Sequence, residues 1–277
     1  MKENKKSPVA LVAGILVLIA ALAVTVYGYA TKTEAEVTKE HTIIIFGLIF
    51  TVVGFAWTVT ALVSYFSKGS VLTNGKSSEK VLFLAQAALF AALSYIGFQF
   101  FKFDIPVGTE KTAFHLGNTF CVLAALFLGG SWGGMAGAVG MTIADMTAGY
   151  MTSAPKTFLL KLCIGLIVGF VAHKLFRLSK PNSEKKITVA VIVSSICGMA
   201  FNVVADPVVG YFYKTYLMGV PQDASKLLAK ISAVTTLVNA ITSVVFASII
   251  YLALRPVLTK AGLFVRLDKS NDKDAVQ

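Results

Sequence analysis

The chain has 277 residues, of which 56% are hydrophobic and only 14% are charged. Soluble domains carry about 25% charged residues, so this composition excludes an ordinary soluble domain and indicates a polytopic membrane protein. The formal net charge of +11 does not require a nucleic-acid partner, because the cytoplasmic loops of membrane proteins collect lysine and arginine.

Cysteine spacing argues against both a disulfide framework and a metal site. Cys121, Cys163 and Cys197 each lie inside an apolar run, without CxxC or Cys/His spacing. Disulfide scaffolds and zinc sites show such patterns. We interpret the three residues as small core side chains and expect no metal.

Two apolar runs, residues 8–30 and 42–66, follow a short lysine-rich lead. A signal peptide is the alternative for the first run, but its apolar core is typically only about 7–15 residues long. We therefore expect a two-helix transmembrane hairpin over residues 1–66. Residues 67–80 have the Gly, Ser, Asn and Lys content of a linker, and we place them in the cytoplasm.

The linker contains half of a phosphate-binding loop. Gly75, Lys76 and Ser77 match its second part, but Ser70 stands where the first glycine is required. Such a loop also needs a preceding strand and a following helix in a soluble α/β unit. The sequence therefore predicts no ATPase in this chain.

Beyond the linker, the sequence predicts an all-α membrane domain of six helices over residues 81–256, followed by a polar cytoplasmic tail over residues 257–277. The six spans are Val81–Phe101, Phe114–Gly129, Trp132–Tyr150, Thr157–Leu178, Ile187–Tyr213 and Lys230–Leu254. With eight spans in all, both termini lie on one side. That side carries 16 of the 25 lysines and arginines, which places both ends in the cytoplasm.

Polar side chains inside apolar spans are the first candidates for function. Asn202 and Asp206 are four residues apart and project from one helix face. With Asn118 and Asn239, they could supply hydrogen bonds to a small polar ligand near the outer face. For any single residue, a hydrogen bond between helices is the alternative. For the set, we favour a binding site.

Asp145 lies toward the outer end of its span, and a carboxylate there is costly unless it is paired or hydrated. Lys156 or Lys161 is its natural partner. This pair could fix two helices structurally or face a ligand. Aromatic residues crowd the same face, mostly as interfacial residues.

Small residues spaced four apart allow helices to approach closely. Gly133 with Gly137 is best explained by packing within the chain. A second set lies on the span that opens the six-helix unit and could equally dock another membrane subunit. It comprises Ala87, Ala88, Ala91 and Ala92.

Three segments carry a resemblance to a known family. Phe114, Gly117 and Asn118 open a span, LAALFLGGSWGGMAGAVGMTIADMTAGY follows, and then SAPKTFLLKLCIGLIVG. This order resembles the substrate-binding S component of energy-coupling factor (ECF) vitamin transporters, in particular the branch for hydroxymethylpyrimidine, pyridoxine and similar vitamins. The resemblance covers residues 80–256, whereas typical members lack residues 1–66.

The resemblance implies a six-helix unit with an outward pocket capped by the loop Lys102–Leu116. It implies no catalytic residue and no covalently bound cofactor. The alanine face would dock a transmembrane T subunit powered by two cytosolic ATPases, and the protein would topple in the membrane to deliver a vitamin. Transferred to this chain, the ligand positions are His115, Asn118, Lys156, Lys161, Asn202, Asp206 and Asn239.

Two other function classes are alternatives for an apolar chain of this kind. An intramembrane enzyme would need a nucleophile with a base or a motif such as HExxH, and neither is present in the sequence. A stand-alone secondary transporter would be favoured by an internal repeat, and none is clear. The ligand stays open between a pyridine or pyrimidine vitamin, riboflavin, pantothenate and a queuosine precursor.

Overall fold

The computed structural model describes residues 12, 14–20, 22, 23, 54, 58, 77–107, 110–264 and 267. The predicted transmembrane hairpin, linker and tail therefore lie mostly outside the described residues. Where the first two runs are described, Gly14 lies against Thr58 and Gly54 lies against Leu18.

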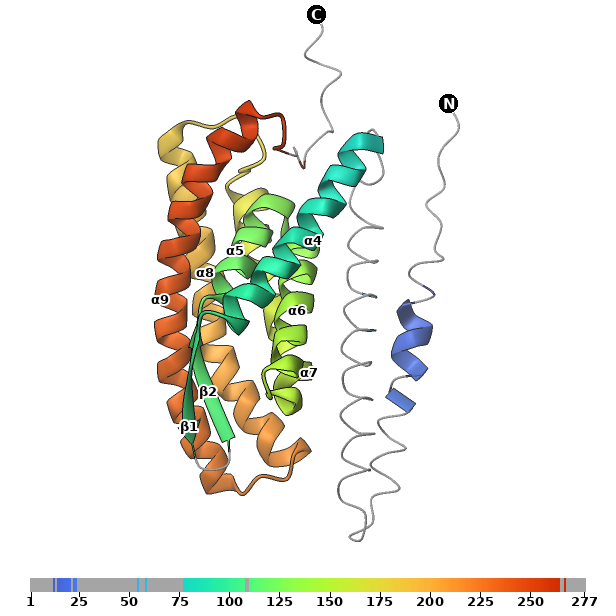
Figure 1. Ribbon diagram of the computed structural model, residues 1–277, viewed down its shortest axis with the longest axis vertical. Coiled ribbons are helices and arrows are strands. Elements are labelled where there is room, and N and C mark those ends of the chain that lie inside the picture. The colour runs from blue at the N-terminus through green and yellow to red at the C-terminus, as the bar shows by residue number, and fades with distance from the viewer. Residues whose placement is uncertain are drawn as a thin grey trace, which may run out of the picture.

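From residue 77 the described chain is mostly helical (Figure 1). The α-helices are α4 Ser77–Gln99, α5 Gly117–Leu128, α6 Gly130–Thr147, α7 Ala154–Gly169, α8 Glu184–Phe212 and α9 Gln222–Lys260. Short turns of other helix types extend some of them, namely η1 Met151–Ser153, η2 Phe170–Leu175 and η3 Tyr213–Leu217.

Four of the described helical stretches are long and apolar enough to cross a membrane. They are Ser77–Gln99, Met151–Leu175, Glu184–Leu217 and Gln222–Lys260. Helix α5 is shorter, with 12 residues. At 1.5 Å per residue, it spans only about 18 Å, because the residues just before it belong to a strand.

That strand is part of a β-hairpin, which corrects the prediction of an all-α domain. Strands β1 Lys102–Val107 and β2 Glu110–His115 are antiparallel, with Lys102 opposite His115. β1 reads KFDIPV, a short alternation of polar and apolar residues typical of an edge strand with proline. The strands adjoin long apolar runs and are too short to stand out from them by length, so the apolar runs alone predict helices here. Figure 1 shows the hairpin alongside α9.

Glycines let α6 pack closely against three neighbours. A Cβ added at Gly133 would lie 2.4 Å from the backbone of Ala124 in α5, and one at Gly140 would lie 2.1 Å from the Ala91 oxygen in α4. On the third side, a Cβ at Gly165 of α7 would lie 2.2 Å from the Gly134 Cα. The prediction that Gly133 and Gly137 serve packing within the chain is confirmed, since both lie against α5.

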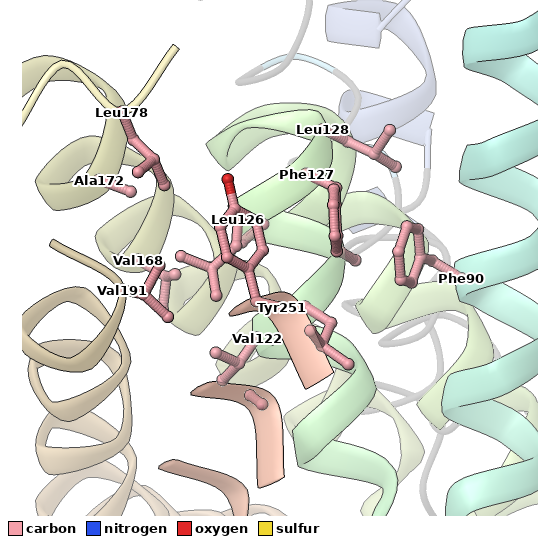
Figure 2. Close-up of a cluster of buried hydrophobic side chains, with 14 of the residues drawn as sticks. Phe90, Val122, Leu126, Phe127, Leu128, Val168, Ala172, Leu178, Val191 and Tyr251 are labelled. Atoms are coloured by element: carbon pink, nitrogen blue, oxygen red, sulfur yellow. The ribbon is translucent and has the colours of Figure 1, made fainter. Parts of the chain in front are cut away.

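The end of the bundle opposite the hairpin is close-packed and apolar, and we call it the packed half. Figure 2 shows its side chains converging from α4, α5, α7, η2, α8 and α9. Phe127 stacks on Phe90 with ring centroids 5.6 Å apart and contacts Tyr251 at 4.5 Å. Val122, Leu126 and Tyr251 are fully buried. Dense packing of this kind holds the helix ends rigidly.

Candidate functional site

A cavity of about 110 Å³ lies in the other half of the bundle, beside the hairpin. One water needs roughly 10–15 Å³ of such space, so the cavity has room for several waters or a small molecule. We call this end the hairpin half. All eight predicted ligand residues line the cavity, namely His115, Asn118, Asp145, Lys156, Lys161, Asn202, Asp206 and Asn239.

Asp206 ties three helices together on one wall of the cavity. Lys156 Nζ of α7 donates to Asp206 Oδ1 at 2.8 Å. From α9, Ser232 Oγ and Thr236 Oγ1 donate to Oδ2 at 2.6 Å and 3.0 Å. Because both carboxylate oxygens are occupied, Asp206 acts mainly as a structural hub. A buried ion pair of this kind needs such extra hydrogen bonds to offset the loss of hydration.

The predicted pairing of Asp145 with a lysine is wrong in the described structure. Lys156 bonds to Asp206 instead, and no described ion pair joins Asp145 to Lys161 within 4.0 Å. Asp145 lines the same cavity as Lys161. The rotation of α7 about its axis decides which lysine pairs with an aspartate, because it points Lys156 toward Asp206 of α8.

Asn239 holds the hairpin against α9. Its Nδ2 donates to the Ala113 oxygen at 3.0 Å, and its Oδ1 accepts from the His115 N–H at 2.9 Å. Thr112 and Thr235 add a contact between their hydroxyls at 3.1 Å. Two isolated strands are marginally stable, so these bonds fix the hairpin over the cavity. Both amide atoms of Asn239 therefore bond to another part of the chain. This is the kind of structural role that the sequence analysis gave as the alternative to ligand contact.

Three other cavity residues carry buried polar atoms that have no hydrogen-bond partner on the described chain. These atoms are both amide atoms of Asn202, Oδ1 of Asn118 and Nδ1 of His115. Asn118 and Asn202 are each 1% exposed. Leaving a buried polar group unpaired costs about 1–3 kcal/mol. Such groups facing one cavity are typical of a site that completes its hydrogen bonds with a bound molecule.

His115, on strand β2, is neutral at physiological pH. Burial lowers the pKa of the imidazole from 6.5 to about 3, and the charge of Lys161 lowers it further. Its ring lies 4.7 Å from the ring of Phe98. A neutral imidazole has one donor and one acceptor nitrogen, so His115 can offer either to a molecule in the cavity.

A polar latch fastens the hairpin to the turn after α6, and sequence reasoning missed it. Tyr150 Oη donates to Asp104 Oδ1 at 2.8 Å, and Lys111 Nζ donates to the Ala148 oxygen at 2.9 Å. Lys102 pairs with Asp104 at 3.2 Å. Partial burial raises the Asp104 pKa, but the bonds from Tyr150 and Lys102 outweigh it and hold this pKa below 3.8.

Sequence reasoning also missed the α9 hydroxyls that hold Asp206. Ser232 and Thr236 are four residues apart, and Asn239 follows three residues later. This spacing places them on one helix face. It could have predicted that these side chains contact the same part of the site. Within the described chain, no cluster of three or more His, Cys, Asp or Glu side chains could hold a metal ion.

The four alanines predicted to dock a T subunit do not all face the same way. Ala88 and Ala92 are exposed on α4. Ala87 and Ala91 are partly buried and pack against the core cluster. Ala88 and Ala92 are therefore the more accessible of the four. Their role in docking stays a prediction.

A partly open cavity with several polar side chains among apolar helices of membrane-spanning length is typical of membrane-embedded proteins that bind small molecules. A family model described as "ECF-type riboflavin transporter, S component" matches residues 78–256. The chain therefore belongs to this family of vitamin-transporter S components and is a transmembrane transport protein. No curated protein and no solved structure matches the chain.

Proposed function

We propose that the chain is the substrate-specific component of an ECF-type importer and captures a water-soluble vitamin or precursor in the cavity beside the hairpin. Family membership over residues 78–256 supports this proposal. The observation that carries it is the set of unpartnered atoms on His115, Asn118 and Asn202 around one cavity. The chain's own residues bind and orient the ligand, and no covalent step is required.

The size of the cavity favours a ligand with one ring. Pockets for drug-sized ligands measure roughly 300–1,000 Å³, whereas this one measures about 110 Å³. A hydroxymethylpyrimidine-like or pyridoxine-like ring suits this space. Riboflavin, named in the family description, has three fused rings and a sugar-alcohol chain. Its binding would require the hairpin to move outward.

For orientation, we propose that the hairpin half faces outward and both termini lie in the cytoplasm. The lysine and arginine bias supports this arrangement. The described six-helix unit would follow a transmembrane hairpin over residues 1–66. Since the sequence contains no complete phosphate-binding loop, a transmembrane T subunit and two cytosolic ATPase subunits would supply energy, and toppling of the S component would deliver the vitamin inward.

Thermal unfolding of the purified chain against a panel of vitamins and precursors tests ligand binding. We expect one chemical class to raise the unfolding temperature and Asn202→Ala to abolish the shift. A panel without any stabilising member would contradict the proposal. Asn182→Ala is the matched control, because Asn182 is bonded to backbone oxygens in an exposed loop.

Uptake by cells tests energy coupling separately. We expect Ala88→Leu combined with Ala92→Leu to abolish uptake while ligand binding persists, because both residues are exposed on α4. Leu89→Ala changes another exposed position of the same helix. It is the control that shows whether any change on the exposed face of α4 lowers uptake. Uptake that survives removal of the ATPase subunits would instead indicate a stand-alone secondary transporter.

A further inference from the structure

The cavity carries more positive than negative side chains. Its lining contains four lysines but only two aspartates. The only histidine in the lining is His115, whose low pKa keeps it uncharged. The charged residues are Lys111, Lys156, Lys161, Lys214, Asp145 and Asp206.

Lys161 is the buried cation that these aspartates leave without an ion pair. Its side chain is 6% exposed, and no carboxylate of the described chain lies within 4.0 Å of its ammonium group. Lys156 is paired with Asp206 at 2.8 Å, and Lys111 lies 3.8 Å from Asp104. The two carboxylates of the cavity lining belong to Asp145 and Asp206, and both oxygens of Asp206 are already engaged by Lys156, Ser232 and Thr236.

A buried ammonium without a paired anion is costly. Lys161 reaches the same cavity as the unpartnered amides of Asn118 and Asn202. Lysine is a common binder of phosphate and carboxylate groups because it acts as a compact point charge with three donors. Neutral amides beside it can orient the uncharged part of a ligand. The site therefore combines one anion-binding point with a set of neutral hydrogen-bonding groups.

We infer that the ligand of this cavity is a small organic anion whose carboxylate or phosphate group pairs with Lys161. The inference rests on the proposed function, since it specifies the chemical class of vitamin or precursor bound at the same site. Asn118 and Asn202 then contact the polar edge of the ligand. The ion pair that forms on binding offsets the free-energy cost of removing the Lys161 ammonium group from water.

Matched pairs of acidic and neutral compounds test this inference on the purified full chain. Pantothenate with pantothenol and nicotinate with nicotinamide examine a carboxylate. Pyridoxine 5′-phosphate with pyridoxine and riboflavin 5′-phosphate with riboflavin examine a phosphate. Affinity is measured by titration calorimetry for the wild type, Lys161→Met, Lys161→Arg and Lys226→Met. Lys226 is an exposed lysine of α9 outside the cavity lining.

We expect the acidic member of at least one pair to bind ten-fold or more tightly than its neutral partner. Lys161→Met should remove that preference, whereas Lys161→Arg and Lys226→Met should keep it. Equal or tighter binding of the neutral members, or a preference that survives in Lys161→Met, would overturn the inference and leave the proposed function intact. Binding of no member would count against the proposed function and the inference together. If Lys161→Met does not fold, Lys161→Gln serves in its place.

Discussion

The two halves of the bundle are built from the same helices but differ in what their side chains surround: a close-packed apolar core in one half and a polar cavity in the other. On α9, Thr236 and Asn239 face the cavity, while Tyr251, three to four turns further along, is fully buried among apolar side chains. On α5, Asn118 has an unpartnered oxygen, while Val122 and Leu126 are completely enclosed. Unpartnered buried atoms also occur in the packed half, on Ser248 and Tyr251 of α9, but these residues do not line the cavity, whereas Asn118 and Asn202 do. The comparison indicates that the packed half stabilises the fold and that the hairpin half gathers polar groups around one cavity.

The largest expected effect contrasts a core side chain with an amide of the cavity. Phe127→Ala should destabilise the protein by about 4 kcal/mol, because it leaves a void beside Phe90 and Tyr251. Asn202→Ala should change stability by less than about 1 kcal/mol, since its amide bonds to nothing on the described chain. Thermal and denaturant unfolding in detergent measure both. Equal losses would remove the distinction between the halves.

A second prediction concerns helix approach in the packed half. Gly165→Ala should cost about 3 kcal/mol or more, because its Cβ would lie 2.2 Å from the Gly134 Cα, where backbone cannot yield. Gly210→Ala is the matched control in a helix near the cavity, where the nearest atom is the end of the Lys156 side chain at 3.4 Å. It should be neutral or slightly stabilising. Similar unfolding temperatures for the two variants would contradict the packing described for α6 and α7.

The third prediction concerns the ion pair between Lys156 and Asp206 in the hairpin half. Asp206→Asn should cost about 3 kcal/mol, because Lys156 loses its charged partner in a largely buried position. Adding Lys156→Met to Asp206→Asn should recover part of the loss. Unfolding of the two single variants and the double variant measures the coupling. Strict additivity would show that the pair does not stabilise the helix contact.

The smallest expected effect concerns the hairpin latch. Tyr150→Phe should cost about 1 kcal/mol locally by removing the bond to Asp104. Because the Asp104 pKa is depressed in the folded protein, the latch contributes fully above the unfolded value of 3.8 and is lost as pH falls through the lower folded value. The protection of the amides of residues 102–107 against hydrogen exchange, taken relative to the intrinsic rate at each pH, should fall in that acidic range. In Asp104→Asn this protection should already be low at neutral pH, and an identical pH profile in that variant would contradict this role.

Residue spacing in the sequence was enough to predict where the polar residues gather. Asn118 opens its span, whereas Asn202 and Asp206 lie toward the end of theirs. Because successive spans run in opposite directions, such positions meet at one face of the membrane. The structure places all eight candidates around one cavity. Whether each touches a ligand stays a prediction.

The sequence could not predict which polar groups pair with each other. Lys156 and Lys161 are five residues apart on α7, and only the rotation of that helix against α8 assigns Asp206 to the first. The hairpin was missed because its stability depends on Asn239 and Tyr150, which are distant in the sequence. Such tertiary contacts override local patterns.

The most direct test of the central claim is an experimental structure of the chain with the vitamin or precursor that stabilises it. Our account predicts one small molecule in the cavity, with hydrogen bonds to Asn118 and Asn202 and the hairpin closed over it. A ligand bound elsewhere, or one that leaves both amides unpaired, would contradict the account.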